Sequence, residues 1–209
     1  QKPAYGADVL RLWVSSVDYS GDSNIGDGII KQVSDAYRKL RNTARFIVGN
    51  LHDYSPEEHA VPLDELPSLD RYMLGRLSAF SDEVTEAYDT HQFYRVYQAL
   101  LRFSTTDLSN FYLDAGKDRL YIAAADDPRR RAAQTVLHKM LLHYTAALAP
   151  LLPHTADDIW RNLPERLRSG ATVAGGGEAE SVFLAGWPAE RERFEAHEEE
   201  WWGFVRSLR

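Results

Sequence analysis

The sequence predicts an all-α protein in which long helices form a bundle. Apolar residues recur at steps of three and four along several segments, which is the spacing of one face of an α-helix. Prolines and short polar stretches separate these segments, and no alternation of strand-like and helix-like segments indicates a parallel sheet. We therefore expect about four or five long helices joined by short links.

Two helices are expected in the first quarter of the chain. Residues 5–17 have the pattern of a short amphipathic helix, and a loop rich in glycine and aspartate follows. Residues 27–50 carry the clearest periodicity and predict one long helix with a narrow apolar seam. The apolar set of the first helix is Val9, Leu10, Leu12 and Trp13, and the seam of the second is Ile30, Val33, Tyr37, Leu40, Ala44, Ile47 and Leu51.

The middle of the chain predicts three more long helices. Residues 69–89 and residues 91–120 each present one apolar face. Asp127 is an N-cap candidate followed by proline at the first helical position, so the third of these helices should run from there to Leu148.

The C-terminal part predicts shorter elements. Thr155 lies three residues before an aspartate, which resembles a capping box and predicts a short helix to Leu163. Residues 170–181 are rich in glycine and predict a flexible loop, residues 182–184 suggest one short strand, and residues 190–208 a last helix.

Composition excludes several classes of protein. The chain has 209 residues, 44% of them apolar, which is enough for a sizeable core, and it contains no cysteine. A disulfide scaffold, a thiol nucleophile and a cysteine-ligated zinc or iron–sulfur site are therefore excluded. No apolar run approaches about 18 residues, so we expect no membrane partner and a cytoplasmic location. The first residues lack both a signal-peptide pattern and an initiator methionine, which suggests a piece of a longer chain.

The net charge of −7 is unevenly distributed. Residues 178–200 contain eight acidic and two basic residues, a local balance of −6 that supplies most of the deficit. Residues 31–51 contain five basic residues and one acidic residue, a balance of +4. An acidic protein with one basic helix still offers a local surface for an anionic partner.

No residue pattern indicates catalysis or a metal site. The sequence has no phosphate-binding glycine loop, no GxSxG and no HExxH. His138 and His143 are five residues apart, which does not bring them to one helix face, and Asp157 with Asp158 is better explained as a helix start. Asp107 falls on an apolar face and is expected to be a buried, hydrogen-bonded structural acid.

The strongest candidate site is a basic stripe on the helix predicted over residues 27–50. Lys31, Arg38, Arg41 and Arg45 fall on one side of it, about a third of a turn from the apolar seam, and Asn42 lies beside them. Guanidinium groups bind phosphates in a fork and stack on bases, so the stripe suits RNA. The alternative is a solvated face paired with acidic residues of the bundle, which is the commoner arrangement in proteins generally.

Two further basic spots lie later in the chain. Lys117 and Arg119 form one, and residues 129–131, three consecutive arginines, form the other. Cations in the first turn of a helix oppose the helix dipole, which costs a few tenths of a kcal/mol. We therefore expect a phosphate, or a neighbouring carboxylate such as Asp126 or Asp127, to compensate for them. Most aromatic residues fall on helix seams and are expected in the core.

Several segments together resemble class I aminoacyl-tRNA synthetases, and best the bacterial isoleucyl-tRNA synthetases. The resemblance covers about residues 4–190, in order and with family-like spacing. Valyl relatives usually carry tryptophan where this chain has Arg41. The segments are YGADVLRLWVSS at 5–16, YRKLRNTARF at 37–46, LSNFYLDAGKDRLY at 108–121, RRRAAQT at 129–135 and APLLPHTADDIWRNL at 149–163.

The resemblance implies a module for tRNA recognition without an active site. Residues 1–24 would end a stem-contact region after the catalytic domain, 25–168 would form the anticodon-binding bundle, and 169–209 a small annex. The resemblance implies a monomer that binds isoleucine tRNA, with ATP and magnesium, and zinc in some members, used only elsewhere in the parent ligase. The residues expected to bind tRNA are Arg38, Lys39, Arg41, Asn42, Arg45, Lys117 and Arg119, and those expected in the stem contact are Asp8 and Arg11.

Three alternatives remain open at this point. The chain could be the same domain of a valyl or leucyl relative, or a freestanding RNA-binding paralogue of the synthetases. It could also be a helical scaffold that binds protein through its seams and acidic tail, in which case neutralising the arginine stripe would cost no function.

Overall fold

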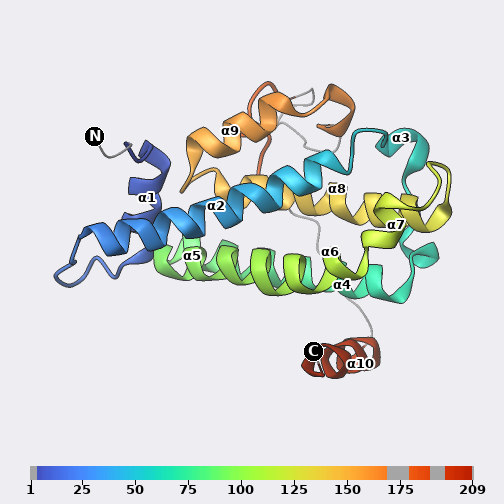
Figure 1. The fold of residues 1–209 in the computed structure, drawn as a ribbon, viewed down its shortest axis with the longest axis horizontal. Coiled ribbons are helices and arrows are strands. Elements are labelled where there is room, and N and C mark those ends of the chain that lie inside the picture. Colours follow the sequence, from blue (N-terminus) through green and yellow to red (C-terminus); the bar gives the residue numbers. More distant parts are fainter. Residues whose placement is uncertain (1–3, 169–178, 189–195, 209) are drawn as a thin grey trace.

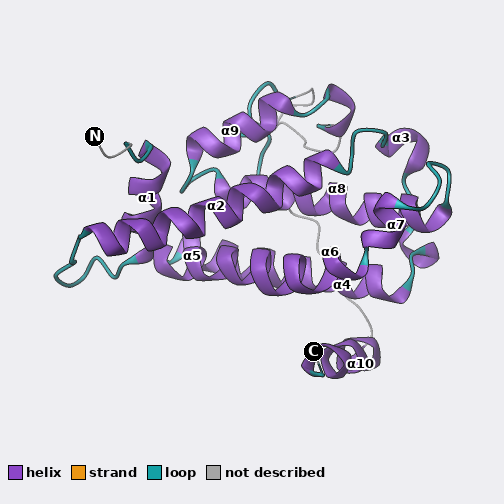
Figure 2. Cartoon of the chain, viewed as in Figure 1, coloured by secondary structure: helices purple, strands orange, loops and turns teal. Residues whose placement is uncertain are grey.

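Long helices lie side by side along the longest axis of the molecule in the computed structural model (Figure 1). They are α2 (Asp27–Gly49), α4 (Ser68–Asp89), α5 (Phe93–Arg102) and α8 (Pro128–Leu148). Helix α4 packs against α5 and α8, and α2 packs against α5 and α8. The structure describes residues 4–168, 179–188 and 196–208, and within these ranges all regular structure is helical (Figure 2).

The bundle confirms the predicted all-α class and the two long helices with the clearest patterns. Helix α2 buries Val33, Leu40, Ala44 and Ile47, which are all on the predicted seam. Helix α4 begins one residue before its predicted start and ends at the predicted residue, Asp89. Regular apolar periodicity without an internal proline was therefore sufficient to locate these helices.

Helix α1 (Ala7–Ser16) crosses one end of the bundle and contacts α2, α5 and α9 (Pro153–Asn162). Val9 and Leu12 are buried there, as predicted. Leu10, which we expected in the same apolar set, is 53% exposed, and Val14 is 51% exposed one turn later. Neighbours cover only one side of α1, so the face that carries Leu10 and Val14 meets solvent.

The prediction of a single helix over residues 91–120 is wrong, because the segment is divided into several helical elements. Helix α5 ends at Arg102, a π-helix, η2 (Phe103–Tyr112), follows, and two short helices, α6 (Leu113–Ala115) and α7 (Lys117–Tyr121), complete the segment. The buried residues of η2 recur in pairs at a spacing of four. Hydrogen bonding in this segment follows the wider i→i+5 pattern, and all three pairs turn toward the core. These pairs are Phe103 with Ser104, Asp107 with Leu108, and Phe111 with Tyr112.

The buried acid expected at position 107 is confirmed. Asp107 is 1% exposed, and its Oδ1 accepts hydrogen bonds from Arg76 Nε at 3.1 Å and Arg206 Nη1 at 2.6 Å. Arg206 belongs to α10 (Ala196–Ser207), which packs against α4. The ion pairs therefore join η2, α4 and α10 around one carboxylate.

The start of α8 is confirmed in detail, and that of α9 (Pro153–Asn162) is not. Asp127 caps α8 by accepting a hydrogen bond from the backbone N–H of Arg129 at 2.8 Å, with Pro128 at the first helical position. The capping box predicted at Thr155 is wrong, because α9 already begins at Pro153 and no side chain caps it through that pattern. The Thr155 hydroxyl instead binds Asp8.

Short elements complete the described chain. They are α3 (Pro56–His59), the 3-10 turn η1 (Leu63–Glu65) and the 3-10 turn η3 (Glu165–Leu167). The strand suggested at 182–184 is wrong, because the N–H of Leu184 binds the carbonyl of Ser181 at 2.9 Å in a local turn. Most of the predicted glycine-rich loop and the first part of the predicted last helix lie outside the described residues.

The predicted division of the chain into a stem-contact region, a bundle and an annex, at residues 24/25 and 168/169, stays a prediction.

None of the helices in the described ranges is both long and apolar enough to cross a bilayer.

Candidate nucleic-acid interface

The outward face of α2 carries a row of exposed cations. The apolar seam turns toward α5 and α8, and the residues between the seam positions therefore point to solvent. We call this surface the α2 basic face. Its exposed members are Lys31, Arg38, Lys39, Arg41, Asn42 and Arg45, which include all the residues of this helix predicted to bind tRNA.

The α2 basic face is only partly neutralised by acidic neighbours. Arg38 Nη2 lies 2.6 Å from Asp35 Oδ1, with both side chains more than half exposed. The guanidinium groups of Arg41 and Arg45 have no hydrogen-bond or ion-pair partner among the residues that the structure describes. Among the described residues, the alternative of a face paired with the bundle's own acids therefore holds for Arg38 and not for Arg41 or Arg45.

In the part of the chain that the structure describes, three open hollows border α2 and share Asn42 as a lining residue. The first, of about 560 Å³, is also lined by Arg38, Arg41 and Asp8. The second, of about 390 Å³, lies between Arg45, Phe46 and Tyr121. The third, of about 470 Å³, lies against η2 and contains both Lys39 and Lys117. Each hollow thus combines a cation with the Asn42 amide.

Asp8 and Arg11, the predicted stem-contact residues, both make contacts within the chain. Asp8 is buried, and its Oδ2 accepts hydrogen bonds from the N–H of Thr155 at 2.7 Å and from its hydroxyl at 2.6 Å. Arg11 donates to the carbonyls of Leu151 at 2.9 Å and Pro150 at 2.8 Å. These bonds fix α1 to the α8–α9 connection and to the first turn of α9. A role in contacting the tRNA stem stays a prediction, and Asp8 lies beside the α2 basic face in the first hollow.

Lys117 and Arg119 are two residues apart in sequence but differ in their surroundings. Lys117 is 60% exposed and pairs with Asp114 at 2.7 Å, at the edge of the third hollow. The Arg119 side chain is 16% exposed and donates to Asp70 Oδ2 at 2.6 Å, while the Tyr112 hydroxyl donates to Asp70 Oδ1 at 2.5 Å. Contacts of both cations with RNA stay a prediction, and the geometry favours Lys117.

The ion pair between Arg119 and Asp70 affects the pKa values of both groups that bind this carboxylate. Burial lowers the pKa of Arg119, but the hydrogen bond and charge of Asp70 outweigh it and leave that pKa above its usual value. Burial also raises the pKa of Tyr112, and the negative charge of Asp70 raises it further. The phenol therefore stays protonated and serves as a hydrogen-bond donor to Asp70. Arg119 holds α7 to α4 through this carboxylate.

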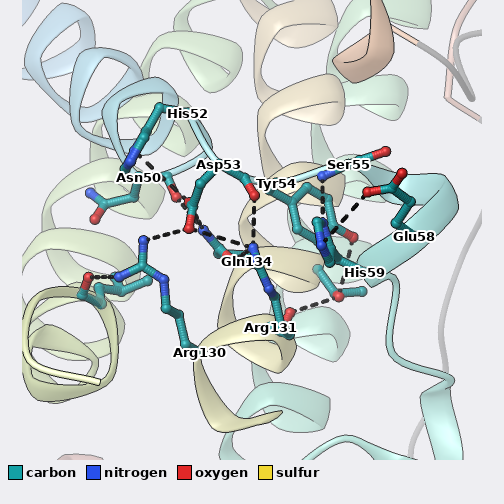
Figure 3. Close-up of polar contacts among 12 residues, drawn as sticks. Asn50, His52, Asp53, Tyr54, Ser55, Glu58, His59, Arg130, Arg131 and Gln134 are labelled. Carbon is teal, nitrogen blue, oxygen red and sulfur yellow. Dashed lines mark hydrogen bonds and ion pairs between the residues drawn. The ribbon is translucent and has the colours of Figure 1, made fainter. Parts of the chain in front are cut away.

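The three arginines at 129–131 are held by carboxylates, which Figure 3 shows for two of them. Arg129 pairs with Asp127 at 2.9 Å, so the expected neighbouring carboxylate is confirmed there. Hydrogen bonds from the Arg129 side chain and backbone lower the pKa of Asp127 to about 2. Arg130 and Arg131 instead reach Asp53, which is 77 residues away from Arg130 and which sequence analysis did not identify.

Asp53 is the centre of this network. Arg130 Nη2 lies 3.0 Å from its Oδ2, Gln134 Nε2 lies 2.7 Å from its Oδ1, and Arg131 Nη1 donates to its backbone carbonyl at 2.9 Å (Figure 3). Burial raises the pKa of Asp53, but the bonds from Gln134 and Arg130 and the arginine charges outweigh it, so the pKa is lowered overall. The Arg130 and Arg131 side chains are 12% and 13% exposed, so this cluster is internal rather than a surface for ligands.

The histidines that we considered for zinc have other partners. His138 Nε2 contacts the carbonyl of Leu167 at 2.8 Å in the core, and His143 Nδ1 contacts the Ser81 hydroxyl at 2.8 Å. In the described ranges no group of three histidine, aspartate or glutamate side chains is arranged to hold a metal ion.

Comparison with known proteins identifies relatives. The sequence model of the family described as "Anticodon-binding domain of tRNA ligase" matches residues 70–208. The isoleucine–tRNA ligase of Synechococcus sp. (strain CC9311) is 51% identical over 194 residues, 93% of this chain and 19% of that protein. The isoleucine–tRNA ligase of Thermosynechococcus vestitus is 54% identical over 187 residues, 90% of this chain and 19% of that protein.

The likeness to these ligases also includes α2, which precedes the residues that the family model matches. The isoleucine–tRNA ligase of Crocosphaera subtropica is 50% identical over 210 residues, which cover 100% of this chain and 21% of that protein. The chain spans about a fifth of the length of the ligases it matches.

Proposed function

The chain belongs to the family of anticodon-binding domains of tRNA ligases, and we propose that it is the tRNA-recognition module of an isoleucine–tRNA ligase. In this proposal the bundle holds the anticodon stem and loop of isoleucine tRNA. The relatives named above are isoleucine–tRNA ligases, which favours isoleucine over valine or leucine as the amino acid of the parent enzyme.

The observation that carries this proposal is the pair of arginines on α2 that have no protein partner in the described residues. Arg41 and Arg45 are one helical turn apart, exposed, and next to the Asn42 amide. Free guanidinium groups can bind phosphates in a fork, and an amide can donate to and accept from a base edge. A tRNA loop supplies both, because its bases can be unstacked and its phosphates follow one another closely.

The parent enzyme in this proposal attaches isoleucine to its tRNA at a catalytic site in another part of the ligase. ATP and magnesium act there, and zinc, where the parent uses it, also binds outside the part of the chain described here. We propose that this ligase acts in the cytoplasm as a monomer. The module contributes affinity and discrimination, with phosphate contacts supplying most of the affinity.

A fluorescence-anisotropy titration tests the proposal. The chain is titrated into the labelled anticodon stem-loop of isoleucine tRNA and into the same stem-loop with a changed anticodon, at two salt concentrations. We expect tighter binding to the native loop and weaker binding at higher salt. Equal affinity for both loops would contradict anticodon recognition by this chain, and no binding at low salt would contradict RNA binding altogether.

Paired variants identify the surface that binds. Arg41→Ala with Arg45→Ala removes the two free guanidinium groups, and we expect it to weaken binding to the native stem-loop. Arg129→Ala with Arg102→Ala is the matched control, because it also removes two exposed arginines, and these are paired with Asp127 and Glu83. Equal losses in the two variants would show that binding depends on total charge rather than on the α2 basic face.

A further inference from the structure

We propose that the second hollow beside α2 is a binding site for one unstacked nucleobase of an RNA loop, with the ring of Tyr121 as its stacking surface. The inference rests on the proposed function, since it names the chemical group that one part of the α2 basic face receives. Tyr121 was not among the residues predicted from the sequence to bind tRNA.

Tyr121 presents an aromatic ring to solvent. It is the last residue of α7, and it is 62% exposed, whereas most large aromatic residues of the chain contribute to the core. The ring is also held in place: it meets the Phe46 ring edge-on, with centroids 6.1 Å apart and an angle of 84°. Phe46 itself packs against the core. A stacking surface that is already oriented loses little conformational freedom when a base binds.

The hollow beside this ring contains the groups that a nucleotide requires. Arg45 supplies a free guanidinium group for a phosphate, and Asn42 supplies an amide for a base edge. Gly49 forms part of the wall, and a Cβ atom added there would meet nothing within 4 Å, so the space beside the backbone is open. Asn50 also lines the hollow, but it is buried and its Nδ2 already donates to the carbonyl of Phe46 at 2.8 Å, so Asn42 is the more accessible amide.

The third hollow offers a useful contrast. Phe46 and Asn42 line it too, but its cations are Lys39 and Lys117, and Tyr121 does not reach it. Two ammonium groups suit successive phosphates, which they bind as point charges rather than by stacking. The exposed tyrosine therefore distinguishes a site for a base from a neighbouring site for the RNA backbone.

Substitution of Tyr121 tests the stacking role. Base–aromatic stacking corresponds to about 5- to 150-fold in affinity, so Tyr121→Leu should weaken binding of the native stem-loop within that range. Tyr121→Phe keeps the ring and should bind within about twofold of the wild type. Tyr19→Leu is the matched control, because Tyr19 is 66% exposed but lies in the α1–α2 connection, far along the chain from this hollow. Circular dichroism melts establish that each variant is folded.

Abasic stem-loops identify the base. We expect one loop position at which removal of the base weakens binding to the wild-type protein. The same removal should change the affinity of Tyr121→Leu little, because that variant has already lost the stacking contact with the base. Unchanged affinity in Tyr121→Leu, together with a loss in the Arg41→Ala Arg45→Ala variant, would overturn the base site and leave the proposed function intact. A loss in Tyr121→Leu that is the same for every abasic loop would also overturn it. Absence of binding by the wild type would overturn the proposed function itself.

Discussion

The exposed arginines of α2 and the enclosed arginines of α7 and α8 form similar basic clusters in the sequence but have opposite surroundings. Arg41 and Arg45 face solvent without a partner in the described residues. Arg119 binds Asp70, and Arg130 binds Asp53, at 2.6 and 3.0 Å. For Arg119 and Arg130, availability to a ligand is therefore decided by carboxylates that come from distant parts of the chain.

The difference has a direct energetic meaning. An enclosed guanidinium group has lost part of its hydration and needs its carboxylate, so removing either partner leaves an uncompensated charge in the protein. An exposed guanidinium group retains water and counterions, which it can exchange for a phosphate when RNA binds. Substitutions in the enclosed set should therefore act on folding, and those in the α2 basic face on binding.

The largest effect is expected for Arg119→Ala. Asp70 is 0% exposed and would keep only the Tyr112 hydroxyl as a described partner, so we expect a loss of about 3–5 kcal/mol in the free energy of unfolding. Lys117→Ala is the matched control at an exposed ion pair, and it should change that free energy by less than about 1 kcal/mol. Urea denaturation measures both, and equal losses would remove the distinction between enclosed and exposed cations.

A smaller loss is expected for Asp53→Ala. The change removes the acceptor of Arg130 and Gln134, whose side chains remain in the protein, and the carboxylate itself is 23% exposed. We expect the free energy of unfolding to fall by about 2–3 kcal/mol. Asp35→Ala removes the carboxylate of the exposed Arg38 pair and should cost less than about 1 kcal/mol. A large loss in the free energy of unfolding of Asp35→Ala would contradict the conclusion that this face of α2 is solvated.

On the exposed side, Arg41→Ala should weaken RNA binding by about 1–3 kcal/mol without lowering stability. The variant should also reduce the slope of log affinity against log salt by about 1 if Arg41 contacts a phosphate. Anisotropy titrations at several salt concentrations measure both quantities. Affinity equal to that of the wild type would contradict the assignment of Arg41 to the interface while leaving the fold untouched.

The helices could be predicted from the sequence because each depends on local information. The seam of α2 and the Asp127 cap with Pro128 are contained within a few residues, and both are confirmed. The π-helix η2 and the true start of α9 could not be predicted, because they depend on packing against neighbours and on Asp8, which is 147 residues from Thr155. Propensity is overridden wherever such distant partners act.

The candidate site was predictable to the same extent. The periodicity of α2 was enough to separate the face that carries Arg41 and Arg45 from the seam. Which arginines are enclosed could not be predicted, because their carboxylate partners are distant in sequence: Asp53 is 77 residues from Arg130. Tyr121 carried no local signal either: only the fold leaves its ring exposed beside Phe46.

The smallest expected effect concerns pH, and it again separates enclosed from exposed side chains. Burial lowers the pKa of His138 below its ordinary value of 6.5, an effect that its hydrogen bond to Leu167 only partly offsets. The folded state therefore binds fewer protons than the unfolded state as the pH falls below about 6.5, so stability is present above this pH and declines below it. His138→Gln keeps a neutral donor for the Leu167 carbonyl and should make that decline shallower in urea titrations across this range. His154→Gln, at an exposed position of α9, should leave the decline as it is in the wild type. An unchanged decline in His138→Gln would mean that the acid sensitivity of the fold originates elsewhere.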